Sequence, residues 1–265
     1  MQFSEVMASL RAADEGGWQA QTDETWLQGR SLFGGIQAAL AVAAMRQASG
    51  VEAPLRSLQV SFIAPVPAGL VRLQVQVLRQ GRSATQVECR IVDGDQVLCT
   101  LLGIFGAARE SAIQIDQPLA APQRALERCD ELPYMEGVMP AFLQHVRQRW
   151  TGGGFPFTGQ PAARFQVHVS LRESQPASEA ALVALADAIP TPALTLLKKP
   201  AVASSLTWTL ELLADALPEA RMDQPWRFDA EVTAARSGYA NQSAVLSTPD
   251  GQAIALSRQT VVVFA

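Results

Sequence analysis

The sequence predicts an α+β protein built from two similar units, each a helix packed on an antiparallel sheet. Three observations predict this fold class. Alternating apolar residues mark strands in both halves of the 265-residue chain, the same turn signals recur in the same order, and an apolar helical segment precedes each set of strands. Because the second half repeats the pattern of the first, we expect a duplicated supersecondary unit.

The strand regions cover residues 56–106 and 204–264. In "VRLQVQVL", residues 71–78, every second side chain is apolar, which is typical of a half-buried strand. An Asp-Gly dipeptide between alternating runs predicts a hairpin turn. Both regions contain an Arg-Ser pair and then such a dipeptide: Arg82-Ser83 and Asp93-Gly94 in the first, Arg236-Ser237 and Asp250-Gly251 in the second.

The first helix is expected over Gly35–Ala48 and the second over Ala177–Pro190, with Ser178 as its N-cap. The first is apolar nearly all round up to Arg46, so it must be wrapped, and the concave face of a curled sheet would do this. Gly34 and Gly35 allow a tight turn into it. They also expose backbone N–H groups at its positive end, where a polarised carbonyl or an anion can bind. The alternative is that the Gly-Gly pair is only a turn.

These patterns divide the chain into an N-terminal unit (1–110), a connector (111–160) and a C-terminal unit (161–265). The connector contains the irregular segments "LPYMEGVMPAF" and "WTGGGFPFTG". A short strand over 162–172 is expected to open the second unit, and residues 16–27 are its counterpart in the first.

Composition excludes several classes of function. The net charge of −4 and the lack of a Lys/Arg cluster argue against nucleic acid as a partner. No apolar run reaches a membrane span, so no membrane association is expected, and the absence of a signal sequence predicts a cytoplasmic protein. The three cysteines and two histidines have no metal-ligand spacing, so no metal site is expected.

Three segments together resemble the acyl-CoA thioesterase II-like family: "LFGGIQAALAVAA", "LRSLQVSFIAPVPAG" and "VQVLRQGRSATQVECRIVDGDQVLCTLLGIF". The resemblance implies a double hotdog fold, with two helix-wrapped antiparallel sheets joined into one continuous sheet. It implies hydrolysis of acyl-CoA to a free acid and CoA without a cofactor, and a homo-oligomer.

In that family an Asp, a Ser/Thr and a Gln of the second unit activate water. The resemblance assigns the Gln to Gln259 and the hydroxyl to Thr233. It puts Thr207 at the position of the Asp, which removes the expected base there and implies weak activity. It also implies that Gly35 polarises the thioester carbonyl.

Asp187, in "ALADAIP", is the best candidate for a relocated base, because a carboxylate on an apolar helix is costly unless it is paired or functional. The alternative is a helix-end residue that faces solvent. Glu211, four residues after Thr207 on the same strand face, is a weaker candidate. Arg82 and Arg236 are candidates for binding CoA phosphates, with surface solvation as the alternative.

Two other functions stay open. A protein of this fold can bind acyl-CoA or a fatty acyl group without turnover, and Thr207 favours that reading. It can also be a structural or partner-binding domain with a closed site.

Overall fold

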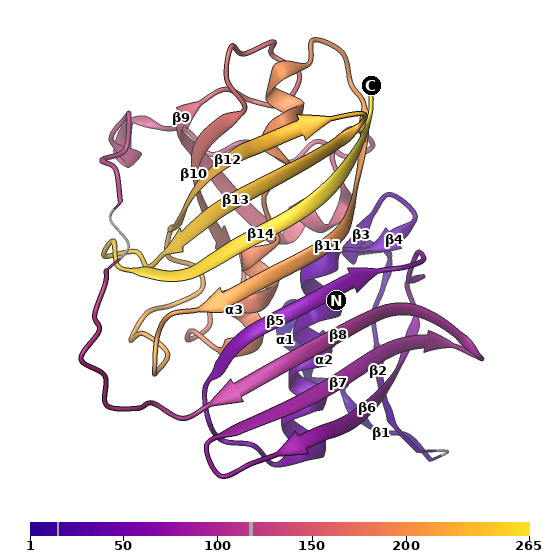
Figure 1. Ribbon diagram of the computed structural model, residues 1–265. Coiled ribbons are helices and arrows are strands. Elements are labelled where there is room, and N and C mark those ends of the chain that lie inside the picture. The colour runs from indigo at the N-terminus through magenta and orange to yellow at the C-terminus, as the bar shows by residue number, and fades with distance from the viewer. Residues whose placement is uncertain (15, 117–118) are drawn as a thin grey trace.

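The protein is described here from a computed structural model covering residues 1–14, 16–116 and 119–265. It confirms the α+β class: twelve strands form one continuous antiparallel sheet in the order β1-β2-β6-β7-β8-β5-β11-β14-β13-β12-β10-β9 (Figure 1). The strands of the first half are β1 (Arg11–Ala12), β2 (Trp18–Gln21), β5 (Leu55–Phe62), β6 (Leu70–Gln80), β7 (Ala84–Asp93) and β8 (Gln96–Gly106). Those of the second half are β9 (Val146–Gly153), β10 (Arg164–Leu171), β11 (Val202–Leu212), β12 (Trp226–Arg236), β13 (Tyr239–Ser247) and β14 (Ala253–Phe264). A small separate hairpin consists of β3 (Leu27–Gln28) and β4 (Ser31–Leu32).

The two halves of the sheet are joined where β5 pairs with β11. Reading outward from this junction, β8, β7, β6 and β2 on one side correspond to β14, β13, β12 and β10 on the other. The expected duplication is therefore present as a pseudo-twofold arrangement, and the two half-sheets lie edge to edge.

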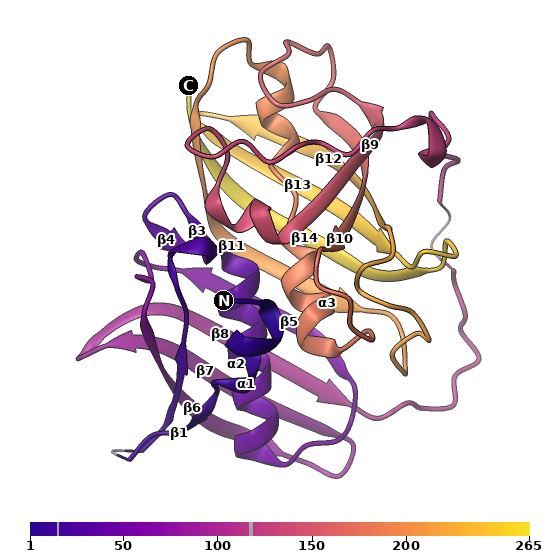
Figure 2. The ribbon, with the colours of Figure 1, turned by 180° about the vertical axis from the view of Figure 1, so that it is seen from behind.

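The three α-helices of the described ranges lie on one face of the sheet, as Figure 2 shows from behind: α1 (Phe3–Ala8), α2 (Gly34–Ser49) and α3 (Glu179–Ala186). Helix α2 packs on β6, β7 and β8 and also on α1 and α3. Eleven of its sixteen residues are buried, including Ala38, Leu40 and Val42. The sheet and the other helices surround α2, and this explains why its sequence is apolar on nearly all sides. Gly50, with φ of 64°, ends it in the left-handed conformation.

Helix α3 is shorter than the expected 177–190. Ser178 is its N-cap and accepts a hydrogen bond from the Ala181 amide at 3.2 Å. Asp187 is its C-cap, and Thr191 then caps a separate 3₁₀ helix, η4 (Pro192–Leu196). The two prolines that follow Asp187 explain the early end, because Pro cannot donate a helical hydrogen bond.

The connector is more ordered than its sequence suggests. It holds η2 (Leu126–Arg128), η3 (Ala141–His145) and strand β9, which pairs with β10 at the sheet edge. At the N-terminal end, the expected strand over 16–27 is only β2, followed by η1 (Glu24–Trp26). In the described ranges no helix has the length and hydropathy needed to cross a membrane. The division at 110 and 160 stays a prediction.

Candidate active site

The start of α2 and the end of α3 meet beside the β5–β11 junction. The contact is possible only because α2 begins with two glycines. A Cβ on Gly34 would lie 2.6 Å from Oδ2 of Asp187 and 2.8 Å from Cζ of Phe62, and a Cβ on Gly35 would overlap the carbonyl oxygen of Ala184. The carboxylate of Asp187 therefore lies directly against the first turn of α2.

Gln259 contacts this carboxylate from the sheet. It lies on the helix-facing side of β14 and is 7% exposed. Its Nε2 donates a hydrogen bond to Oδ1 of Asp187 at 2.6 Å. The last strand and the helix of the second unit are thus linked through one amide–carboxylate contact.

Two further polar side chains fix the other end of the Gln259 amide. Oε1 of Gln259 accepts hydrogen bonds from Oγ of Ser205 at 3.3 Å and from Nε2 of Gln242 at 3.2 Å. These residues come from β11 and β13, the strands on either side of β14. The carboxamide is therefore held with its oxygen toward two donors and its N–H group toward Asp187.

The environment of Asp187 raises the pKa of its carboxyl group from the ordinary value of 3.8 to about 7. Burial is the largest cause, because it disfavours the charged form; the hydrogen bonds from Gln259 and from the backbone of Gly35 act in the opposite direction. A pKa near neutrality is the property expected of a general base. The group can accept a proton from water and return it at physiological pH.

Aromatic rings wall this site. The ring of Phe62, at the end of β5, reaches Gly34. Phe33, the N-cap of α2, stacks on Phe142 of η3, with ring centroids 3.9 Å apart and planes 2° apart. The connector segment therefore covers the N-terminal end of α2.

The structure brings together four residues singled out from the sequence: Gly34, Gly35, Asp187 and Gln259. It does not bring Thr207 to them. Trp208 and Gln259 are paired across β11 and β14 and both are buried, so the neighbouring Thr207 lies on the opposite, exposed face, as does Glu211. In this position Thr207 does not contact Asp187.

Thr233 is also outside the cluster. It lies at a bulge in β12 between Val232 and Ala234, is exposed, and donates a hydrogen bond to the carbonyl oxygen of Asn241 at 3.0 Å. The hydroxyl that contacts Gln259 belongs to Ser205 instead.

The two arginine candidates lie at different ends of the molecule. Arg236 is exposed at the β12–β13 turn, three residue pairs from the Gln242–Gln259 pair, or about 10 Å along the strand. Arg82 is exposed at the β6–β7 turn, beside the end of β8 where Arg46 lies over Phe105. Arg46 follows Gly34 by twelve residues of α2, so that end lies about 18 Å from Gly34.

Sequence reasoning missed Ser205 and Gln242, for different reasons. A bulge between Ser205 and Thr207 changes the alternation of β11, so that Ser205 and Trp208, three residues apart, face the same way. For Gln242 a signal existed. If residues are paired outward from the Asp250-Gly251 turn, Gln242 lies opposite Gln259, and the observed register of β13 and β14 has the same pair.

The histidines and two of the cysteines lie elsewhere. His145 stacks on Trp26, with ring centroids 4.1 Å apart, and its Nε2 lies 2.8 Å from Oγ1 of Thr25. Burial lowers the pKa of His168 to about 4. Burial also raises the pKa of Cys89 and Cys99, which fill the core. Among the residues the structure describes, no group of His, Cys, Asp and Glu is arranged to hold a metal.

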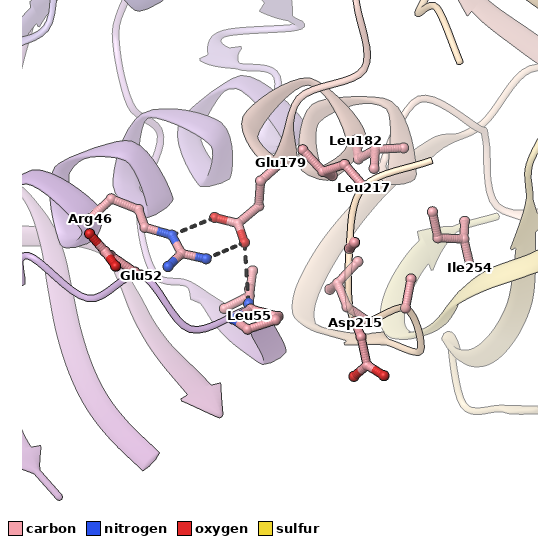
Figure 3. Close-up of a pocket in the computed structure, with 12 residues that line it drawn as sticks. Arg46, Glu52, Leu55, Glu179, Leu182, Asp215, Leu217 and Ile254 are labelled. Carbon is pink, nitrogen blue, oxygen red and sulfur yellow. Dashed lines mark hydrogen bonds and ion pairs between the residues drawn. The ribbon is translucent and has the colours of Figure 1, made fainter. Parts of the chain in front are cut away.

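A cavity of about 280 Å³ lies at the opposite helix ends, where the end of α2 meets the start of α3 (Figure 3). There the guanidinium of Arg46 makes two hydrogen bonds to the carboxylate of Glu179, at 2.9 and 2.6 Å. Glu179 also accepts the Leu55 amide at 3.2 Å. This junction is the pseudo-symmetric counterpart of the Asp187 site, and an ion pair occupies it.

Comparison with known families and structures agrees with this architecture. The family description "Acyl-CoA thioesterase N-terminal domain" matches residues 22–106, and "Acyl-CoA thioesterase C-terminal domain" matches residues 126–263. No curated protein gives a significant match to the sequence.

Similar solved structures share the fold along the whole chain. A hot dog fold protein of unknown function from Alicyclobacillus acidocaldarius has a TM-score of 0.89 at 22% identity, over 99% of this chain and 98% of the other. A putative thioesterase II from Thermobifida fusca has a TM-score of 0.81 at 19% identity, over 99% and 97%. An acyl-CoA thioesterase II from Mycobacterium marinum has a TM-score of 0.74 at 16% identity, over 98% and 97%.

Proposed function

The chain belongs to the acyl-CoA thioesterase family, and we propose that it hydrolyses acyl-CoA thioesters with Asp187 as the general base. The observation that carries the proposal is the carboxylate of Asp187, which is half-buried and held between the amide of Gln259 and the first turn of α2. In this proposal Asp187 supplies the base that Thr207 cannot supply, since its carboxylate is in contact with Gln259.

In the proposed reaction, Asp187 accepts a proton from a water molecule whose oxygen attacks the thioester carbonyl carbon. Ser205 and Gln259 orient this water. The developing oxyanion lies at the positive end of α2, near the backbone N–H group of Gly34, because the N–H group of Gly35 donates to the carboxylate of Asp187. The carbon–sulfur bond then breaks, and the proton passes from Asp187 to the leaving thiolate to give a free acid and CoA.

The pKa of Asp187, about 7, supports this role because a base of this strength is partly ionised at neutral pH. The phenylalanine rings around Gly34 supply an apolar environment suited to an acyl group. Arg236, at the end of the β12–β13 hairpin nearest the site, is the proposed contact for a CoA phosphate.

Release of CoA from a panel of acyl-CoA chain lengths tests the proposal. Asp187→Asn should lower kcat by about 10²–10⁴-fold, the usual contribution of a general base. The control is Asp95→Asn, an exposed carboxylate in the β7–β8 turn. Binding of acyl-CoA without turnover by the unaltered protein would favour the non-catalytic acyl-CoA or fatty-acyl binding function instead.

A further inference from the structure

We propose that Gln242 is a positioning residue, which holds the carboxamide of Gln259 in the orientation that points its N–H group at Asp187. This inference rests on the proposed function for its kinetic readout only. The geometry behind it is independent of what the substrate is.

An isolated carboxamide can turn by 180° and exchange its donor for its acceptor. Gln259 would then present Oε1 to the carboxylate of Asp187, which is repulsive when Asp187 is ionised. Nε2 of Gln242 prevents this because it donates to Oε1 of Gln259 at 3.2 Å, and this contact is fully buried. Ser205 donates to the same oxygen at 3.3 Å but is only half-buried.

Two successive hydrogen bonds connect the three residues: Gln242 donates to Gln259, and Gln259 donates to Asp187. Gln242 and Gln259 face each other directly across β13 and β14. Gln242 is 5% exposed, and the chain continues from Nε2 of Gln259 to Oδ1 of Asp187 at 2.6 Å. Each amide therefore donates toward the carboxylate, and removal of the first donor weakens the second hydrogen bond.

The cost of burying Gln242 also points to a role beyond packing. Among the described residues, its Oε1 is buried and has no hydrogen-bond partner. An apolar side chain of the same size would avoid the penalty of a buried, unsatisfied carbonyl. The neighbours of Gln242 on the same face of β13, Ala240 and Ala244, are small and apolar, so Gln242 differs from both of its neighbours on this face.

No charged side chain of the described elements contributes to the ionisation of Asp187. The causes that set its pKa are burial, Gln259 and the backbone of Gly35. On α3 itself, Glu179 lies at the other end of the helix and is paired with Arg46. The side chains that surround Asp187 from the sheet are uncharged: they are Phe62 of β5, Ser205 of β11 and Gln259 of β14. The start of α2 contributes only glycines. A change in the hydrogen bond from Gln259 should therefore be visible as a change in the titration of Asp187.

The test uses Gln242→Met, which keeps the volume and removes the donor, and Gln242→Glu, which makes the side chain an acceptor. Gln242→Met should raise the pKa of Asp187 by about half a pH unit, and Gln242→Glu by more than about one, because Gln259 then turns its N–H group away. The pKa is measured from the acidic limb of the pH profile of kcat/KM. It is measured independently from the pH dependence of the stability difference between each protein and its Asp187→Asn counterpart.

Gln37→Met is the matched control. Gln37 is also a buried glutamine with an unpartnered Oε1 in the described part of the chain, and its Nε2 donates to the carbonyl oxygen of Leu32 at 2.6 Å. It should lower stability without changing the pKa of Asp187.

A double-mutant cycle completes the design. In a Gln259→Met background, Gln242→Met should have no further effect on the titration of Asp187, since its effect passes through Gln259. If Gln242→Met and Gln242→Glu lower stability or kcat while the pKa of Asp187 stays unchanged, Gln242 is only a packing residue and the proposal is overturned. If the titration shifts as expected but no CoA is released by any variant, the positioning role stands and the proposed hydrolysis fails.

Discussion

Replacing Asp187 by Asn should make the protein more stable at alkaline pH than the unaltered chain. The pKa of Asp187 is about 7 in the folded protein and 3.8 when unfolded, so between these values the folded state binds more protons. The free energy of unfolding must therefore fall as the pH rises from about 4 to about 7, and then level off. The full effect corresponds to about 4 kcal/mol, of which about 2–3 kcal/mol lies between pH 5 and pH 8.5. The amide introduced by Asp187→Asn does not titrate, so the variant loses none of this stability.

Urea unfolding followed by tryptophan fluorescence at pH 5 and pH 8.5 measures this difference. Burial lowers the pKa values of His145 and His168, which makes stability rise with pH up to about 6.5. That contribution is the same in both proteins and cancels when the stability of the Asp187→Asn variant is subtracted. A difference in stability that does not change with pH would refute the conclusion that the carboxylate is buried without a compensating charge.

Four further outcomes are expected. Gly35→Ala should cost about 1–3 kcal/mol of stability in urea titrations, because its Cβ would overlap a backbone carbonyl of α3; unchanged stability would mean that α2 and α3 do not meet as described. Ser205→Ala should lower kcat about tenfold, the effect of losing one hydrogen bond that orients water or Gln259. Thr207→Ala, on the exposed face, should leave kcat unchanged, and the reverse result would restore Thr207 to the site. Arg236→Ala should raise KM for acyl-CoA more than Arg82→Ala does, as judged by steady-state CoA release; equal effects would argue against a CoA contact at the β12–β13 turn.

Much of the fold could be predicted from the sequence because its signals are local and repeated. The Asp-Gly dipeptides define hairpins, and Gly94 and Gly251 adopt the positive φ values of 56° and 92° that such turns require. The apolar residues after Gly35 predicted a wrapped helix, and α2 is one. The edge strand β9 was not predicted, because its sequence contains Arg147 and Arg149 and ends in two glycines, and its pairing with β10 is what makes it a strand.

The candidate site was only partly predictable, because it depends on tertiary contacts. Asp187 was recognisable as a carboxylate in an apolar helix, and Gln259 through the family resemblance. The family resemblance also assigned the hydroxyl to Thr233 and placed Thr207 at the position of the Asp, on the assumption that the strands alternate regularly. Alternation fails at a bulge, and the bulges in β11 and β12 lie beside these two residues. The family membership and the double hotdog fold are confirmed, whereas the roles of individual residues and the oligomeric state stay predictions.

The ion pair between Arg46 and Glu179 makes the two helix junctions of the duplicated fold chemically different. The two places where α2 and α3 meet are related by the pseudo-twofold arrangement of the sheet. One holds the proposed site at Asp187, and the other holds an ion pair that links the first unit to the second. Substitutions at this ion pair can alter how firmly the halves are joined without contacting the proposed reacting groups, which lie about 18 Å away along α2 and about 12 Å away along α3. In a single chain, substitutions can therefore change the stability of the contact between the units and the rate of the proposed reaction independently. In a symmetric dimer of identical subunits, each substitution would occur at both junctions.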